Sequence, residues 1–250
     1  MKKTIERHHR EALRDLLLGY VEHCEIAPNL TGTLERTLYH HGVKYAVPAF
    51  SFRGPIPPDG PTRFIGLVAG RHGGDRLSAE VTLQLIERLV LQPGLGEGLW
   101  LRILPVLDPV GLERGNEAAP PAELGEIDEA VRLRCGHGVI EIATSNRAFP
   151  AIGLRADPEW KEAAYAAVES TDRLASEGDG SPDTRYRFQV NELPASARVP
   201  WNLYIAIPAS WNPSAATHFA SQWLLVFFRH LQSQANLHPQ PDSKRETLTV

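Results

Sequence analysis

The residues in this sequence that are best suited to chemistry follow short apolar runs. They are Arg71, His72 and Asp75 after the run at 63–69, Asp108 after the run at 99–107, and Asn146 and Arg147 after the run at 139–143. If these runs are parallel strands, their carboxyl ends meet at one edge of a sheet, where α/β proteins bind ligands. We therefore expect these side chains to border one crevice. There, Arg147 could bind an anionic group or form an ordinary salt bridge.

The apolar runs alternate with amphipathic segments, which predicts a largely parallel sheet covered by helices on both faces. The expected strands are 33–40, 43–52, 63–69, 99–107, 139–143 and 201–207, and the expected helices are 5–23, 77–91, 158–175 and 215–234. Residues 1–235 are expected to form a single domain. The polar, proline-bearing tail at 236–250 is expected to be disordered.

Two motifs lie in the stretch from Val47 to Asn116, with the helix at 77–91 between them. They read Ala69-Gly70-Arg71-His72-Gly73-Gly74-Asp75 and Pro105-Val106-Leu107-Asp108-Pro109-Val110-Gly111. This stretch resembles the zinc carboxypeptidases, and it is closest to their succinylglutamate desuccinylase and aspartoacylase branch. That family has A-G-x-H-G-x-E and P-x-x-N-P-x-G at these places.

The resemblance implies a three-layer α/β/α fold of the zinc-carboxypeptidase (phosphorylase/hydrolase-like) type, with a mixed, mainly parallel sheet. It also implies a zinc with three protein ligands and an open position for water. His72 and Asp75 match the first two ligands, and Asp75 is one methylene shorter than the family's Glu. Ala143 stands at the position of the third ligand, a His. Ala206, or Ile207 if the alignment shifts by one, stands at the Glu that acts as general base toward the zinc-bound water.

Other family features are also missing. Asp108 replaces the Asn of the second motif, and the D-x-N-R segment between the second and third strands is absent. Loss of a general base typically slows hydrolysis by about 10²–10⁴-fold. Two protein ligands also hold zinc less well than three. We therefore expect zinc to bind weakly or not at all, and we expect hydrolysis to be impaired.

Glu141 is a candidate substitute for the third ligand. It lies two residues before Ala143 and so faces the same side of a strand, roughly 6.6 Å further along it. The alternative is a supporting structural role for Glu141, as in the family. His137 should lie at the opposite edge of the sheet, and His218, near the start of the last helix, is expected at the surface or in a cap.

Composition excludes some function classes. The 250 residues carry 26 Lys and Arg against 30 Asp and Glu, a formal net charge of −4, with no long basic block. This balance argues against nucleic-acid binding driven by charge. No apolar run is long enough for a membrane span or a signal peptide. The two cysteines do not form a disulfide framework, and we expect a cytoplasmic protein.

Three functions remain open. The first is a degenerate carboxypeptidase-like protein that binds a small or peptide-like ligand in the crevice through Arg71, Asp108, Asn146 or Arg147. The second is a divergent zinc-dependent carboxypeptidase or N-acyl amino acid deacylase that uses His72, Asp75 and a substitute such as Glu141. The third is a non-catalytic interaction module, which a crevice filled by Trp201, Trp211 or the loop at 176–185 would favour. Neither the ligand nor the oligomeric state follows from the sequence.

Overall fold

The computed structural model describes residues 2–56, 62–73, 75–114, 123–156, 187–192 and 199–233. For residues 2–12, 187–192 and 233, only the backbone is described. The helix expected at 158–175, the loop at 176–185 and the tail expected at 236–250 lie outside the described residues.

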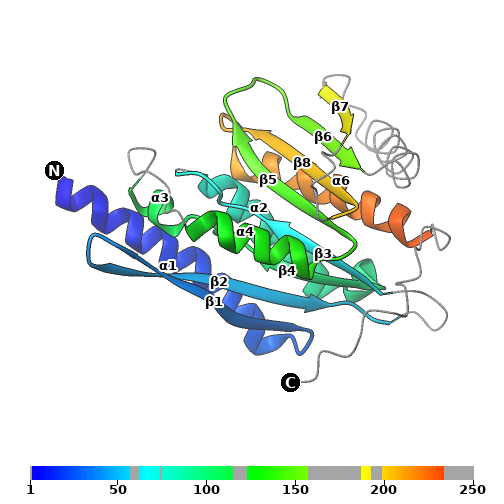
Figure 1. Cartoon of the computed structure of the whole chain (residues 1–250), viewed down its shortest axis with the longest axis horizontal. Coiled ribbons are helices and arrows are strands. Elements are labelled where there is room, and N and C mark those ends of the chain that lie inside the picture. Colours follow the sequence, from blue (N-terminus) through cyan, green and yellow to red (C-terminus); the bar gives the residue numbers. More distant parts are fainter. Residues whose placement is uncertain are drawn as a thin grey trace.

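Figure 1 shows the helices and strands of the described chain. In order, they are α1 (Lys2–Ile26), β1 (Leu30–His40), β2 (Val43–Arg53), β3 (Arg63–Val68), α2 (Arg76–Leu91), the 3₁₀ helix η1 (Pro93–Gly96), β4 (Leu99–Leu104), α3 (Pro109–Arg114), α4 (Glu123–Arg134), β5 (Gly138–Ser145), β6 (Ala151–Ala156), β7 (Arg187–Glu192), β8 (Trp201–Pro208) and α6 (Pro213–Ser233).

The strands form one mixed sheet of eight, in the order β1-β2-β4-β3-β5-β8-β6-β7. The four central strands β4, β3, β5 and β8 run parallel to one another. The hairpin of β1 and β2 adds antiparallel to β4, and β6 pairs antiparallel with β8 on the other side. The carboxyl ends of the four central strands therefore meet at one edge, as the sequence predicts.

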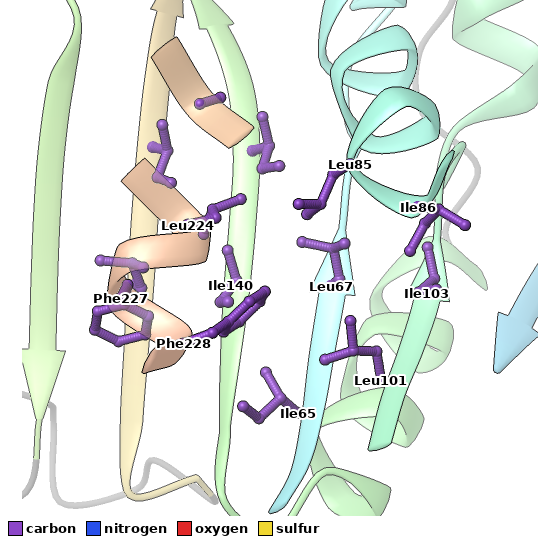
Figure 2. Packing of buried hydrophobic residues seen from close by; sticks show 14 of the residues in the cluster. Ile65, Leu67, Leu85, Ile86, Leu101, Ile103, Ile140, Leu224, Phe227 and Phe228 are labelled. Carbon is purple, nitrogen blue, oxygen red and sulfur yellow. The ribbon is translucent and has the colours of Figure 1, made fainter. Parts of the chain in front are cut away.

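The central strand β3 is buried on both faces. Ile65 and Leu67 of β3 belong to the core that packs against α1, α2 and α6, whereas the next residue, Val68, belongs to the core that packs against α4. Figure 2 shows Leu85 of α2 beside Leu67, and Phe228 of α6 beside Ile140. The alternation follows from the two-residue period of a strand. It confirms the three-layer α/β/α architecture.

Several of the expected elements begin or end at other residues than predicted, and the structure also contains elements that were not predicted. The run at 99–107 stops being a strand after Leu104, because Pro105 has no N–H with which to continue the ladder. The helix α4, which was not expected, lies before β5 with Leu124, Ile127 and Val131 buried. The short helix α3 and the strands β6 and β7 were also not expected.

Gly138, at the start of β5, should be intolerant of a side chain. Its φ is +149°, and a Cβ there would lie 2.2 Å from Cε2 of the buried Trp201 ring. We expect Gly138→Ala to lower the free energy of unfolding by about 3 kcal/mol, from backbone strain and overpacking together. Urea denaturation measures this. The control is Gly136→Ala, where nothing lies within 4 Å of the added Cβ. Equal stability of the two variants would contradict the packing described here.

Candidate functional site

The turn that follows β3 is held by the turn that follows β4. Gly70 adopts φ +58°, a conformation that favours glycine, and its carbonyl oxygen accepts a hydrogen bond from Asp108 N–H at 2.8 Å. A Cβ on Gly111 would lie only 2.9 Å from Cα of Gly73. The two motifs found in the sequence therefore form one packed unit at the carboxyl edge of the sheet.

Asp75 ends the first motif and is 3% exposed. Its Oδ1 accepts a hydrogen bond from Thr144 N–H at 3.1 Å, which ties the motif to the end of β5. Its Oδ2 is buried and has no hydrogen-bond partner among the described residues. Burial raises the pKa of Asp75 to about 6, although hydrogen bonds from Ser78 and Thr144 act to lower it. The carboxyl therefore points toward β5 and has one unused oxygen.

Asp108 has a structural role. Its Oδ1 accepts a hydrogen bond from Gly111 N–H at 2.8 Å, within the first turn of α3. Burial raises the pKa of Asp108, and the nearby charge of His72 counteracts this in part. His72 itself is exposed. The sequence placed both residues at the crevice, and the structure puts them close to each other there.

Three alanines lie side by side where catalytic groups were sought. Ala143 of β5 and Ala206 of β8 are direct register partners, and Ala151 of β6 is the next partner of Ala206. Residues directly opposite each other share one face of a sheet, so the three methyl groups form one row. Ala143 and Ala206 are 4% and 3% exposed. This row carries no metal ligand and no proton acceptor.

Glu141 is engaged in a group of ion pairs. Arg132 of α4 contacts its Oε1, and Asn202 Nδ2 donates to the same oxygen at 2.9 Å. Arg71 Nη2 lies 3.5 Å from Glu141 Oε2 and 2.8 Å from Asp128 Oδ1. Arg132 Nε also lies 3.1 Å from Asp128 Oδ2. Two guanidiniums thus balance two carboxylates, and we call these four charged residues with Asn202 the ion-pair network.

Tyr204 lies between the ion-pair network and the carboxyl edge of the sheet. It is the register partner of Glu141, on the same face as Ala206. Burial raises its pKa, the charges of Asp75 and Glu141 raise it further, and those of Arg147 and Arg71 lower it. Tyr204 is thus under the influence of charges of both signs. Arg147 follows the end of β5 by two residues, at the carboxyl edge of the sheet. Asn146 and Arg147 are exposed, and no described residue pairs with the Arg147 guanidinium.

The sequence located the two motif turns, but of the five residues in the ion-pair network it identified only Arg71 and Glu141. Asn202, Tyr204 and Ala206 are each two residues apart on β8. The two-residue period of a strand alone could therefore have placed all three on the same face of the sheet. Asp128 and Arg132 have the four-residue spacing of a helical ion pair. They were missed because α4 was not expected. His137, which was placed at the opposite edge, lies there and accepts a hydrogen bond from Phe64 N–H.

Two further expectations can be compared with the structure. Trp201 was a candidate for filling the crevice, but it begins β8 and lies at the opposite edge of the sheet, packed against Phe227. Trp201 therefore lends no support to an interaction module with a filled crevice. Trp211 follows β8 and packs edge-on against Phe219 of α6.

In the part of the chain that the structure describes, no helix is both long and apolar enough to cross a bilayer.

The described side chains do not suit a three-ligand zinc site. Among the described residues, no group of three His, Cys, Asp or Glu side chains is arranged so that it could hold a metal ion. His72 and Asp75 supply two candidate ligands, and the neighbouring row of alanines supplies none. Glu141 lies on the same face of β5 as Ala143, but its carboxylate oxygens already contact Arg132, Arg71 and Asn202.

No protein-family model matches the chain, and no curated protein matches it significantly. Solved structures do. A metallo-carboxypeptidase from Burkholderia cenocepacia superposes with a TM-score of 0.63 at 13% identity, over 86% of this chain and 68% of that one. Carboxypeptidase A from Helicoverpa armigera gives 0.59 at 12% identity, over 87% and 72%.

A succinylglutamate desuccinylase/aspartoacylase from Rhodobacter sphaeroides gives a TM-score of 0.55 at 13% identity, over 80% of this chain and 65% of that one. Identities this low establish the fold alone. They agree with the resemblance found in the two sequence motifs, which names the same two groups of proteins. The chain has the fold of the metallo-carboxypeptidases.

Proposed function

We propose that this protein binds a small or peptide-like ligand with a carboxylate group in the crevice, and that it does not hydrolyse this ligand. The observation that carries the proposal is the alanine row of Ala143, Ala206 and Ala151, since the family has its third zinc ligand and its general base at the first two positions. A methyl group can neither bind a metal nor accept a proton. Hydrolysis by the family's route would therefore lack two of its groups.

Ligand binding remains chemically possible at the same edge. The guanidinium of Arg147 is exposed and has no partner among the described residues. Arg71 is 30% exposed and its buried Nε is without a hydrogen-bond partner in the described part of the chain. Guanidiniums bind carboxylates through paired, charge-assisted hydrogen bonds. Tyr204, which is 40% exposed, adds an aromatic ring and a hydroxyl between them.

A zinc-dependent hydrolase is the second candidate, and one observation favours it. Asp75 Oδ2 is buried without a described partner, and His72 is exposed in the same turn. An unpaired buried carboxylate oxygen is costly, and a cation would satisfy it. This candidate still needs a third ligand. Glu141 could serve only by giving up its contacts with Arg132 and Asn202.

Zinc content separates the two candidates. After zinc loading and desalting, elemental analysis should find far less than one zinc per wild-type chain, because only two ligands are available. Ala143→His supplies the missing ligand and should raise the zinc content toward one per chain. The same samples should show no hydrolysis of peptides or N-acyl amino acids by the wild type. One zinc per wild-type chain that disappears in His72→Ala would establish the second candidate instead.

The crevice ligand can be sought with N-acetyl amino acids and dipeptides in isothermal titration calorimetry. Arg147→Gln should weaken binding of any ligand found by about tenfold or more, because one charge-assisted hydrogen bond is lost. Arg155→Gln is the matched control, since Arg155 is exposed on β6 at the other edge of the sheet. Binding that is unaffected by Arg147→Gln would show that the ligand lies elsewhere.

Asp75 should make stability depend on pH. Its pKa rises from 3.8 to about 6 on folding, so between these values the folded state binds more protons than the unfolded state. The free energy of unfolding should therefore be highest below pH 4 and fall by at most about 3 kcal/mol as the pH rises through 6. Asp75→Asn should remove this fall. Denaturation midpoints at pH 4 and pH 7 provide the measurement.

The control for this experiment is Asp15→Asn, at an exposed carboxyl on α1, which should keep the wild-type pH dependence. Added zinc should leave that dependence unchanged in the wild type. A metal that binds Asp75 would stabilise its ionised form and flatten the curve, which would support the second candidate.

A further inference from the structure

A pocket lies between α2 and α6, far from the carboxyl edge of the sheet. It has a volume of about 450 Å³ and is lined by Arg88 and Gln92 beside Leu95 of η1, and by residues of α6. Because α2 runs back from the carboxyl edge of the sheet, Arg88 is roughly 20 Å from Asp75 along the helix, at about 1.5 Å per residue. The pocket is thus independent of the alanine row and of the ion-pair network.

The lining residues of α6 form one stripe on that helix. They are Gln222, Leu225, Val226 and Arg229, at positions i, i+3, i+4 and i+7. The stripe ends in a guanidinium and begins with an amide, with two apolar side chains between them. Across the pocket, Arg88 and Gln92 of the α2 end repeat the same pair of polar groups, and Leu95 adds a third apolar side chain.

Among the described residues, nothing compensates the positive charge of this pocket. Its described lining contains two arginines and no acidic residue, although the chain as a whole is acidic. In the described part of the chain, neither the Arg88 nor the Arg229 guanidinium forms a salt bridge or a hydrogen bond. Two cations that face one cavity repel each other, and a bound anion would relieve that repulsion.

The walls of the pocket are fixed by the fold. A Cβ on Gly54 would lie 1.6 Å from the carbonyl oxygen of Gly96, so η1 packs directly against the chain after β2. Gln232 of α6 donates a hydrogen bond to the carbonyl oxygen of Glu97, just after η1. At the end of α2, the carbonyl oxygen of Arg88 accepts a hydrogen bond from Gln92 N–H. This bond fixes Gln92 relative to the last turn of α2.

From these features we infer that the pocket between α2 and α6 binds an amphiphilic organic anion. Its head group is a carboxylate or a phosphate held by Arg88 and Arg229, with Gln92 and Gln222 as further donors. Its short apolar part lies against Leu95, Leu225 and Val226. The volume is in the range of sites for small ligands, about 300–1,000 Å³. The inference does not depend on the function proposed for the crevice.

The test is isothermal titration calorimetry on the full chain with hexyl phosphate, hexanoate and inorganic phosphate. We expect at least one of the two hexyl compounds to bind, and to bind more tightly than inorganic phosphate, because only the hexyl compounds contact the apolar wall. Comparing hexyl phosphate with hexanoate identifies the preferred head group. No binding of either below roughly 1 mM would overturn the inference, as would inorganic phosphate binding equally well.

Variants assign the binding to this pocket. Arg88→Gln and Arg229→Gln should each weaken binding about tenfold, and the double variant should abolish it. Arg155→Gln and Arg147→Gln, which change exposed arginines outside the pocket and at the crevice, should leave the affinity unchanged. Thermal unfolding of each variant confirms that it is folded. If Arg155→Gln weakens binding as much as Arg88→Gln, the anion is held by general surface charge; if Arg147→Gln does so, it is held in the crevice.

Discussion

The parallel alignment of the four central strands is the constraint on which the rest of this structure depends. Because β4, β3, β5 and β8 run in the same direction, their carboxyl ends all lie at one edge of the sheet. Every segment that follows one of these four strands therefore starts from that edge. The packed turns around Gly70 and Asp108 and the approach of Asp75 to Thr144 are consequences of this arrangement.

The polar groups at that edge are organised by charge balance rather than by a metal-ligand set. A carboxylate out of water needs a counter-charge or several hydrogen bonds. Glu141 has Arg132, Arg71 and Asn202, so its charge is compensated within the protein. Asp75 has the Thr144 N–H and a second oxygen without a described partner, which is why burial raises its pKa. The two acids closest to the alanine row thus differ in their availability for a ligand.

The sequence predicted most of the fold because the central strands and α2 and α6 carry strong apolar patterns. It missed α4 because glycine and charged residues weaken the pattern between Glu123 and Arg134. Asp128 and Arg132 of the ion-pair network were missed with that helix. The sequence also left open whether Trp201 fills the crevice. The structure shows that this ring packs against Gly138 at the other edge.

By itself, the sequence determined the central strands with α2 and α6, and it located the motif turns that carry His72 and Asp75. These are local properties, because apolar period and residue identity are readable one segment at a time. The tertiary structure alone decided that Ala143, Ala206 and Ala151 form one row, that Glu141 is held by α4, and that Arg88 and Arg229 face one cavity. Such facts depend on strand register and helix packing, which join residues far apart in the chain.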